Sequence, residues 1–427
     1  MLRTEQEHMD AKVLIVGTTP DYINAIDSFA GSRVLFLTDI KLRKNAIEPV
    51  PDLPKEVCSD LSNANQAISD LIDHLNRYSL SINGIACYDC ESLELASLIG
   101  KHFNVFFQSS ETIRSSRNKF LSKEAWKKAG LKTPRYSLLY SKEDAILFFE
   151  TLESPCVLKP LSGAGSELVY LCRTSEDIIK RFEQIIAGLK ARQDNRLFKT
   201  DKLVILAEEF IEGIEYSCDF MIENNSVQII RLTQKIKSSC SLPFGIIAGY
   251  KLINTIPEVT HENLIATLNK AGTSLGINKS ICMIDFIVKN NEIFLIEIAP
   301  RPGGDCLPSL LFAATEQNII EMAINYASGC KIMPKDYRSI LNMIAFRIFA
   351  DKEGVLKNID ASALIKDKKV LALNLTSYPG KIIKLPPDDY DSWVLGNFIV
   401  HPLNNETDIV DLYSKSIRDI QLKIDAF

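Results

Sequence analysis

Three observations on the sequence predict an α/β protein built from more than one domain. The chain has 427 residues, and at about 150 residues per domain two or three domains are expected. Short apolar runs typical of strands alternate with amphipathic helical patterns, an order typical of parallel α/β folds. After Gly329 the pattern changes to short strands and turns, which indicates a small α+β domain at the C-terminal end.

The N-terminal part of the chain predicts a βαβ beginning. Residues 12–16 form a short apolar run, a turn breaks it, and a helical stretch precedes a second apolar run at residues 33–37. A third strand is expected at residues 84–88, and a helical pattern after it leads into a strand at residues 104–107. We therefore expect a parallel α/β domain over residues 1–108.

The glycine-rich fingerprint of dinucleotide-binding folds is absent from this first domain. Gly17 follows the first strand, and the next glycine is Gly31. The fingerprint needs closely spaced glycines so that the backbone can approach a pyrophosphate. An enzyme that transfers hydride to or from a nicotinamide cofactor therefore has little support.

A basic amphipathic helix at residues 116–129, closed by Gly130, marks the start of a second domain near residue 109. Strands and helices then alternate, with strands expected at residues 155–158, 168–172, 203–207, 217–223 and 227–233. In the C-terminal part, strands are expected at residues 343–349, 370–375, 382–385 and 398–401, followed by a helix from about residue 408.

Composition excludes several classes of protein. With 49 Lys and Arg against 54 Asp and Glu, the formal charge of −5 disfavours a nucleic-acid partner. The chain is 46% hydrophobic and 24% charged, as in folded globular proteins. The first ten residues lack the apolar stretch of a signal peptide, and no apolar run reaches the ~18 residues of a membrane span. A cytoplasmic protein without a membrane partner is expected.

The ten cysteines are scattered, several of them within apolar runs, which favours free buried thiols. Cys87 and Cys90 have the spacing of a redox or zinc motif, but no second pair or histidine cluster accompanies them. A redox or metal role for this pair is the weaker interpretation.

The first segment that carries chemistry is an apolar strand that ends at Lys159 and leads into a loop of small residues. Small residues let the backbone approach a phosphate, inward-pointing amides form an anion site, and a lysine adds a point charge. An ordinary turn explains the same pattern equally well.

The second segment is a strand followed by an extended connector and a glycine turn, over residues 204–219. Such a connector presents backbone groups to a purine edge, while Glu208 can accept from an amino group and Glu215 from ribose hydroxyls. A solvated turn with four glutamates is the simpler alternative.

The third segment, residues 282–304, predicts a hairpin of two apolar strands around an Asn-Asn turn. A three-residue loop, residues 290–292, would place Asp285 opposite Glu297 on one face. The other face would then be wholly apolar and buried, with Phe286, Val288, Phe294, Ile296 and Ile298. A two-residue turn would put the two carboxylates on opposite faces.

Two acidic residues in apolar strands are costly to bury unless a cation compensates their charge. Oxygen ligands on one face suit a hard ion such as magnesium, which also binds phosphate oxygens. Arg301, four residues beyond Glu297, could hold a phosphate or carboxylate with its planar fork. A salt bridge between Glu297 and Arg301 is the alternative.

These three segments, in this order, resemble the ATP-grasp superfamily, whose enzymes join a carboxylate to an amine or thiol through an acyl phosphate. The resemblance implies a preceding α/β domain at residues 1–108 and an ATP-grasp fold of two subdomains at residues 109–329. The mobile small subdomain would span about residues 133–207, and a small C-terminal domain residues 330–427.

By this resemblance, Lys119 matches the family's first phosphate lysine and Lys159 the second. The mobile phosphate loop would comprise Gly163, Ala164, Gly165 and Ser166. Glu208 would meet the adenine amino group, and Glu215, seven residues later, would hold the ribose. The main chain of two further residues, Glu209 and Ile211, would line the purine.

The resemblance also implies the reacting end of the site. Asp285 and Glu297 match the magnesium ligands, with Glu297 bridging two ions. Arg301 fits the arginine that steadies the transferred phosphate or acyl phosphate, and Gly303 and Gly304 fit the turn beside it. Lys159, Glu297 and Arg301 would be the catalytic side chains.

The sequence departs from the family pattern at two positions. Ala299 stands where the family often has asparagine, so the second magnesium ion has fewer protein ligands. Met283 stands where D-alanine ligases carry a substrate-orienting arginine, which disfavours that subfamily. Met283 is one of the candidate substrate-wall positions, with Lys235, Lys237, Pro243, Phe244, Gly245, Cys306 and the loop from residue 238 to 249.

The implied function is that of an ATP-dependent carboxylate–amine ligase that forms an amide or peptide bond between amino acids or similar metabolites. ATP and magnesium, as one or two ions with manganese as an alternative, are the implied cofactors. Small-molecule carboxylates and amines are the implied partners, and a homodimer is expected. A bicarbonate-phosphorylating, carboxylase-like or purine-pathway enzyme and a catalytically silent nucleotide-binding protein stay open.

Overall fold

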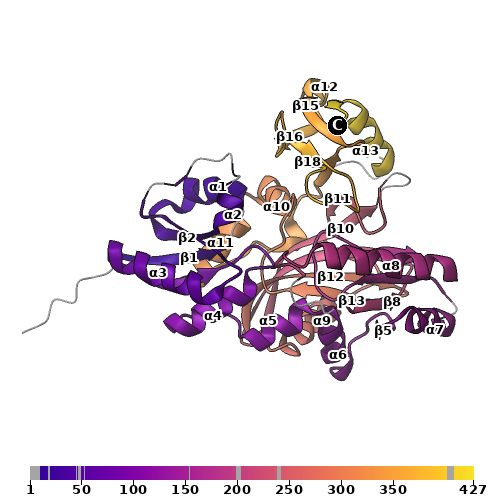
Figure 1. The fold of residues 1–427 in the computed structure, drawn as a ribbon, viewed down its shortest axis with the longest axis horizontal. Helices are drawn as coiled ribbons and strands as arrows, with labels where there is room; N and C mark the ends of the chain where they lie inside the picture. Colours follow the sequence, from indigo (N-terminus) through magenta and orange to yellow (C-terminus); the bar gives the residue numbers. More distant parts are fainter. Residues whose placement is uncertain are drawn as a thin grey trace, which may run out of the picture.

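The computed structural model describes residues 10–17, 20–44, 46, 50–51, 53–152, 154–198, 203–237, 242–401 and 408–427. Figure 1 shows the N-terminal sheet and a small antiparallel sheet at opposite ends of the long axis, with a large sheet between them. The predicted mixed α/β architecture with an N-terminal parallel sheet is confirmed.

The N-terminal sheet has the strand order β3-β2-β1-β4, and all of its neighbours are parallel. Its strands are β1 (Asp10–Val16), β2 (Val34–Asp39), β3 (Glu56–Ser59) and β4 (Leu80–Ala86). Its helices are α1 (Pro20–Ala30), α2 (Ile40–Lys44), α3 (Ala64–Tyr78) and α4 (Leu93–Phe103), with a short 3-10 turn at Gly31–Arg33.

The strand expected at residues 104–107 does not form. Asn104 ends α4 in the left-handed conformation, and the Val105 amide donates to the Gly100 carbonyl at 2.9 Å. The backbone here therefore closes the helix end instead of extending the sheet. The prediction of a strand was wrong at this place.

The basic helix expected at residues 116–129 is two helices, α5 (Ser110–Arg117) and α6 (Lys119–Lys128). Asn118 separates them with an extended backbone, and its side chain accepts from the amides of Phe120 and Leu121. This N-cap makes Lys119 the first residue of α6.

The small sheet is antiparallel, with the strand order β5-β8-β6-β7. Its strands are β5 (Tyr136–Leu139), β6 (Cys156–Pro160), β7 (Tyr170–Cys172) and β8 (Ile205–Glu209). Helices α7 (Lys142–Leu152) and α8 (Ser175–Ala191) pack on it around a core that includes Leu158, Ile178 and Ile205.

The large sheet has eight strands in the order β13-β12-β9-β10-β11-β14-β18-β16. They are β9 (Ile214–Glu223), β10 (Ser226–Lys237), β11 (Ile247–Leu252), β12 (Lys279–Lys289), β13 (Glu292–Ala299), β14 (Ile344–Phe349), β16 (Val370–Leu375) and β18 (Val394–Val400). Helices α9 (His261–Thr273), α10 (Leu307–Thr315) and α11 (Ile319–Ala327) and a 3-10 turn at Tyr337–Ser339 lie between its strands in sequence. The last three strands of this sheet come from the C-terminal part of the chain.

The C-terminal part also forms a three-stranded sheet, with the order β17-β15-β19. Its strands are β15 (Gly354–Asp360), β17 (Ile382–Ile383) and β19 (Gln421–Asp425), accompanied by α12 (Ser362–Lys366) and α13 (Ile409–Arg418). Asp408 caps α13, where a helix start was expected.

The β12–β13 hairpin has a two-residue turn, so the expected three-residue loop was wrong. Asn290 and Asn291 both have positive φ, 52° and 61°, and Lys289 pairs with Glu292. Asp285 nevertheless faces Glu297, because Ile296 is an extra residue that shifts the register between them.

The shorter turn also changes which side chains of β13 are buried. Ile293 and Leu295 join Phe286, Val288 and Ile298 on the buried face, whereas Phe294 and Ile296, expected there, are only half-buried.

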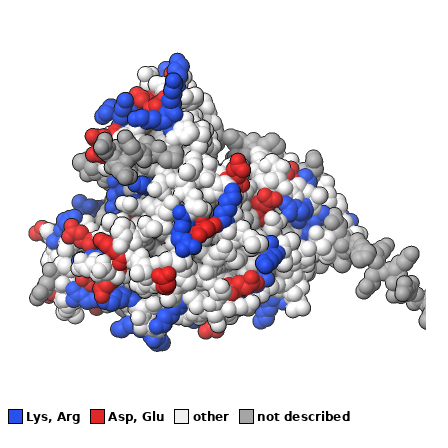
Figure 2. All heavy atoms as spheres, turned by 180° about the vertical axis from the view of Figure 1, so that it is seen from behind, with Lys and Arg blue, Asp and Glu red and all other residues white. Residues whose placement is uncertain are grey.

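Acidic and basic side chains are mixed over the face of the molecule seen in Figure 2. Of the helices formed by described residues, none has the length and apolar character needed to cross a membrane. Nine cysteines lie in the described part of the chain; all nine are free, and all but Cys58 and Cys330 are buried.

Candidate active site

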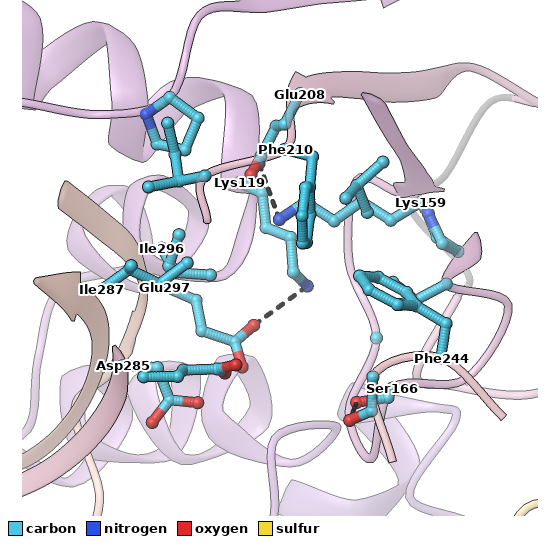
Figure 3. A pocket seen from close by; sticks show the side chains of 18 of the residues that line it. Lys119, Lys159, Ser166, Glu208, Phe210, Phe244, Asp285, Ile287, Ile296 and Glu297 are labelled. Carbon is cyan, nitrogen blue, oxygen red and sulfur yellow. Dashed lines mark hydrogen bonds and ion pairs between the residues drawn. The ribbon is translucent and has the colours of Figure 1, made fainter. Parts of the chain in front are cut away.

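A cavity of about 870 Å³, including solvent at its mouth, lies where the small sheet faces the large sheet. Its walls come from β6, β8, β10, β12 and β13, from the N-terminus of α6 and from the loop after β6. Figure 3 shows Ile287 and Ile296 on one side of it, and Phe244 and Ser166 on the other. Its size suits a small-molecule ligand.

Most of the residues predicted from sequence line this cavity: Lys119, Lys159, Gly163, Ala164, Ser166, Glu208, Glu209, Ile211, Glu215, Asp285 and Glu297. Several candidate wall positions line it too, namely Lys235, Lys237, Phe244 and Gly245. Residues from all three chemistry-bearing segments therefore meet in one place.

Lysine ammonium groups contact the carboxylates on the cavity wall. Lys159 Nζ lies 2.7 Å from Glu208 Oε1, and Lys119 Nζ lies 3.3 Å from Glu297 Oε2, as Figure 3 shows. Lys159 and Glu208 are both buried, so their pair forms in a medium that screens charge weakly, whereas solvent reaches the Lys119–Glu297 pair through the partly exposed Glu297 side chain.

Lys235 bridges two further carboxylates. Its Nζ lies 2.5 Å from Asp285 Oδ2 and 2.8 Å from Glu215 Oε1. Lys237 reaches the other oxygen of Glu215 at 3.3 Å. Asp285, predicted to hold metal, and Glu215, predicted to hold ribose, are thus paired with lysines.

These contacts shift the pKa values of the acids in different directions. Burial raises the pKa of Glu297, but Lys119, Lys235 and Lys159 outweigh it and lower that pKa to about 2. The pKa values of Glu208 and Glu215 are also held below their ordinary value, because neighbouring lysines outweigh burial. Burial dominates at Asp285 and raises its pKa, with Glu297 adding to the effect and Lys235 opposing it.

The pair of Asp285 and Glu297 fits a hard divalent cation. Asp285 Oδ1 is buried and has no hydrogen-bond partner among the described residues, although it lies on the cavity wall opposite Glu297. Oxygen ligands of this kind suit magnesium. The described residues hold no cluster of three or more metal-ligating side chains, so ligands beyond these two acids would come from substrate phosphates and water.

The loop after β6 has a left-handed backbone at three of its positions. Gly163, Gly165 and Ser166 all have positive φ, which is strained for a residue with a Cβ. Ser166 Oγ donates to the Gly245 carbonyl at 2.7 Å, so the loop contacts the segment between β10 and β11. Gly165 belongs to this loop but does not line the cavity.

Apolar side chains line the cavity beside the connector that follows β8. Ile211 is buried, and the rings of Phe210 and Phe244 meet edge to face at 6.0 Å. The Glu209 carboxylate turns away to Arg135, at 3.1 Å. The Glu209 amide also donates to the Arg135 carbonyl, at 2.8 Å, so the predicted main-chain contact of Glu209 with a purine stays a prediction.

Arg301 does not form the salt bridge with Glu297 that the sequence left as an alternative. Its Nε and Nη2 lie 3.2 and 3.0 Å from Cys90 Sγ, at the end of the N-terminal sheet. Arg301 borders a second, mostly apolar cavity that Cys87 also lines. The Cys87 and Cys90 pair lies beside this arginine, and no metal-ligating cluster of three forms in the described part of the chain.

Three predicted substrate residues also lie outside the main cavity. Met283 is half-buried and pairs with Ala299 across the hairpin. The Gly303 amide donates to Asp219 Oδ1 at 2.8 Å, and Gly304 is half-buried beside it. The candidate wall positions Pro243 and Cys306 do not line the cavity either, and residues 238–241 of the candidate loop lie outside the described residues.

Two groups of residues at this site were missed from sequence. Lys123 is fully buried behind Glu208, and its four-residue spacing from Lys119 on one helix face was the only hint. Arg231 and Asp219 form a buried pair at 2.7 Å that holds the Gly303 turn. Their positions in long apolar strands gave no indication of this role.

Comparisons with known proteins agree with this geometry. Residues 152–309 match the family model described as an ATP-grasp domain. A formate-dependent phosphoribosylglycinamide formyltransferase from Wolinella succinogenes is 23% identical over 246 residues, which are 56% of this chain and 57% of that protein. Across this relative and two other curated relatives, the chain spans 52–59% of their length.

Two solved structures are similar over nearly the whole chain. An L-amino acid ligase from Bacillus licheniformis has a TM-score of 0.75 at 17% identity and covers 97% of this chain and 99% of its own. The biotin carboxylase domain of a 2-oxoglutarate carboxylase from Hydrogenobacter thermophilus has a TM-score of 0.67 at 16% identity, covering 97% and 91%. At these identities the likeness shows a shared fold.

Proposed function

We propose that this chain, which carries an ATP-grasp domain at residues 152–309, is an ATP-dependent carboxylate–amine ligase that releases ADP and phosphate. The observation that carries the proposal is the floor of the cavity. There Asp285 faces Glu297 across the bulged hairpin, with one unpartnered carboxylate oxygen and three lysines around the two acids. Such a site can neutralise the charge of a triphosphate and of its transferred phosphoryl group.

The nucleotide would occupy the cavity between the two sheets. Its base would lie between Ile211 and the apolar side chains of β12 and β13, with its amino group at Glu208 and its ribose at Glu215. The lysines Lys119 and Lys159 would exchange their carboxylate partners for phosphate oxygens. The loop of residues 163–166 would cover the phosphates with its backbone amides.

Asp285 and Glu297 would hold magnesium, or manganese in its place, and such an ion would supply positive charge to offset the charge on the transferred group. The loop of residues 163–166 and Phe244 line the same cavity and would exclude water from the reacting phosphoryl group once ligands fill it. With Ala299 at the next position of that face, the two acids would be the main protein ligands of such an ion.

In the proposed reaction, a carboxylate oxygen of the substrate attacks the γ-phosphorus, and the bond from that phosphorus to ADP breaks. The amine nitrogen of the second substrate then attacks the acyl carbon. Inorganic phosphate leaves, and the nitrogen loses a proton as the amide forms. Arg301 is proposed to steady the acyl phosphate, for which it would exchange its present contact with Cys90.

Amino acids are the proposed substrate class. The run of residues 297–304 and the similarity in fold to an L-amino acid ligase over 97% of the chain support this choice. A bicarbonate-phosphorylating or purine-pathway enzyme is the second candidate, favoured by similar folds such as the biotin carboxylase domain. That domain is described as a dimer, which supports the proposal of a homodimer for this chain.

The test is phosphate release from magnesium-ATP by the purified chain, screened against all pairs of common amino acids and repeated with bicarbonate alone. Dependence on an amino-acid pair, with a product of the condensation mass, supports the peptide-forming ligase. Release that depends on bicarbonate supports the second candidate. ATP binding without phosphate release under any condition contradicts both and leaves a nucleotide-binding protein.

A further inference from the structure

Lys123 is a fully buried lysine that the proposed reaction does not use. Its ammonium group forms an ion pair with Glu208 Oε1 at 3.1 Å and donates hydrogen bonds to the Leu295 carbonyl at 3.3 Å and the Ile296 carbonyl at 3.4 Å. Burial lowers the pKa of Lys123 to about 8, although Glu208 opposes the shift, so the group stays charged at neutral pH.

Lys123 and Lys159 share one carboxylate oxygen but differ in their access to the cavity. Both ammonium groups contact Glu208 Oε1, Lys159 at 2.7 Å and Lys123 at 3.1 Å. Lys159 lines the cavity, whereas Lys123 lies behind Glu208 and does not. A ligand phosphate can therefore reach only Lys159.

We propose that Lys123 is a positioning residue with two roles. It is the permanent counter-ion of Glu208, so that Lys159 can leave Glu208 and bind a nucleotide phosphate. It also connects Glu208 to the bulge that presents Glu297. The inference rests on the proposed function, because it requires a nucleotide whose phosphates meet Lys159. Without Lys123, a phosphate that attracts Lys159 would leave the buried carboxylate of Glu208 with no cation, which is strongly unfavourable.

The same ammonium group links two parts of the site. Glu208 belongs to β8 of the small sheet, and the Leu295 and Ile296 carbonyls belong to β13 of the large sheet. Ile296 is the extra residue that turns Glu297 toward Asp285. Lys123 thus joins the base end of the cavity to the acidic end without touching the ligand.

The experiment is calorimetric titration of the full chain with magnesium-ATP and, separately, with adenosine. Adenosine has no phosphate and leaves Lys159 on Glu208. In Lys123→Met, the Kd for ATP should rise by about tenfold or more, while the Kd for adenosine should stay within about twofold. Lys127→Met, which removes an exposed lysine from the same helix, should leave both Kd values unchanged.

A double variant separates charge compensation from simple loss of structure. Glu208→Gln together with Lys123→Met removes both charges and keeps an amide oxygen at position 208, so it should bind ATP more tightly than Lys123→Met alone. If Lys123→Met fails to fold, the double variant should restore folding.

Three results overturn the inference: unchanged ATP affinity in Lys123→Met, equal losses for ATP and adenosine, or no recovery in the double variant. Absence of ATP binding by the unaltered chain would overturn the proposed function itself, which makes the two failures distinguishable.

Discussion

Replacing Glu297 by glutamine removes one negative charge from a site crowded with lysines. Lys119 Nζ lies 3.3 Å from Glu297 Oε2, which corresponds to about 5 kcal/mol of attraction at an effective dielectric constant of about 20. The Glu297 side chain is 34% exposed, so solvent reduces the net contribution of the pair to stability to about 1–2 kcal/mol. The variant is therefore expected to fold.

Turnover should fall far more than stability. Glu297 is proposed to hold the cation that offsets transition-state charge, a contribution of several kcal/mol, so Glu297→Gln should lower kcat by about a thousandfold or more. The assay is ADP and phosphate release with the substrates found in the screen, alongside thermal unfolding of both proteins.

Glu292→Gln is the matched control, since it makes the same substitution at the other end of the same strand, where Glu292 pairs with Lys132 at the surface. Its kcat should stay near that of the unaltered chain. A folded Glu297→Gln variant with kcat within about tenfold of the unaltered chain would refute the metal-ligand role.

Four further outcomes are expected. Because the pKa of Glu297 is lowered to about 2 in the folded protein, its contribution to stability is present above about pH 4.5 and is lost as the pH falls toward 2. Denaturant titrations across this pH range should therefore show a smaller decrease in the free energy of unfolding for Glu297→Gln than for the unaltered chain. Arg301→Gln should lower kcat by about a hundredfold or more while the KM for ATP changes little, since Arg301 lies outside the nucleotide cavity; steady-state kinetics would contradict this if only KM rose. Asn118→Ala should cost about 1 kcal/mol of unfolding free energy and weaken ATP binding, because Asn118 caps the helix that begins at Lys119; an unchanged denaturation midpoint would count against the cap. Removal of divalent cations with a chelator should abolish phosphate release and leave the melting temperature within a few degrees, and added magnesium should restore release; release that persists after chelation would contradict the metal site.

Several residues of the cavity could be predicted from sequence because they lie in short contiguous patterns, whereas Lys119 was predicted only from the resemblance to the ATP-grasp superfamily. Lys159 ends an apolar strand before small residues, and Asp285 and Glu297 interrupt two apolar strands. Patterns of this kind can be recognised in the local sequence without knowing which distant residues they contact.

The register of the hairpin could not be predicted in the same way. The Asn-Asn turn was one residue shorter than expected, and the bulge at Ile296 added one residue back, so two differences cancelled and Asp285 still faced Glu297. Side-chain alternation does not encode a bulge. Phe294 and Ile296 were placed on the wrong face because the turn is one residue shorter than expected, which shifts the alternation of side chains along β13.

Contacts between segments that are far apart in the sequence could not be predicted either. Lys123 is explained only by Glu208 and by two carbonyls of β13, and Arg301 contacts Cys90, more than two hundred residues away. Strands β15 and β19, which pair with each other, were missed because neither has a strong local pattern.

The shared large sheet has a consequence for how this chain can be divided. Strand β11 pairs with β14, and a Cβ at Gly249 would lie 2.3 Å from the Ala345 carbonyl, so the two backbones are closely apposed. A fragment that stops near residue 330 would leave β11 as a bare edge, open to pairing with other copies. The pairing of β11 with β14 therefore joins the cavity-bearing part of the chain to its C-terminal part, and a fragment truncated near residue 330 should aggregate.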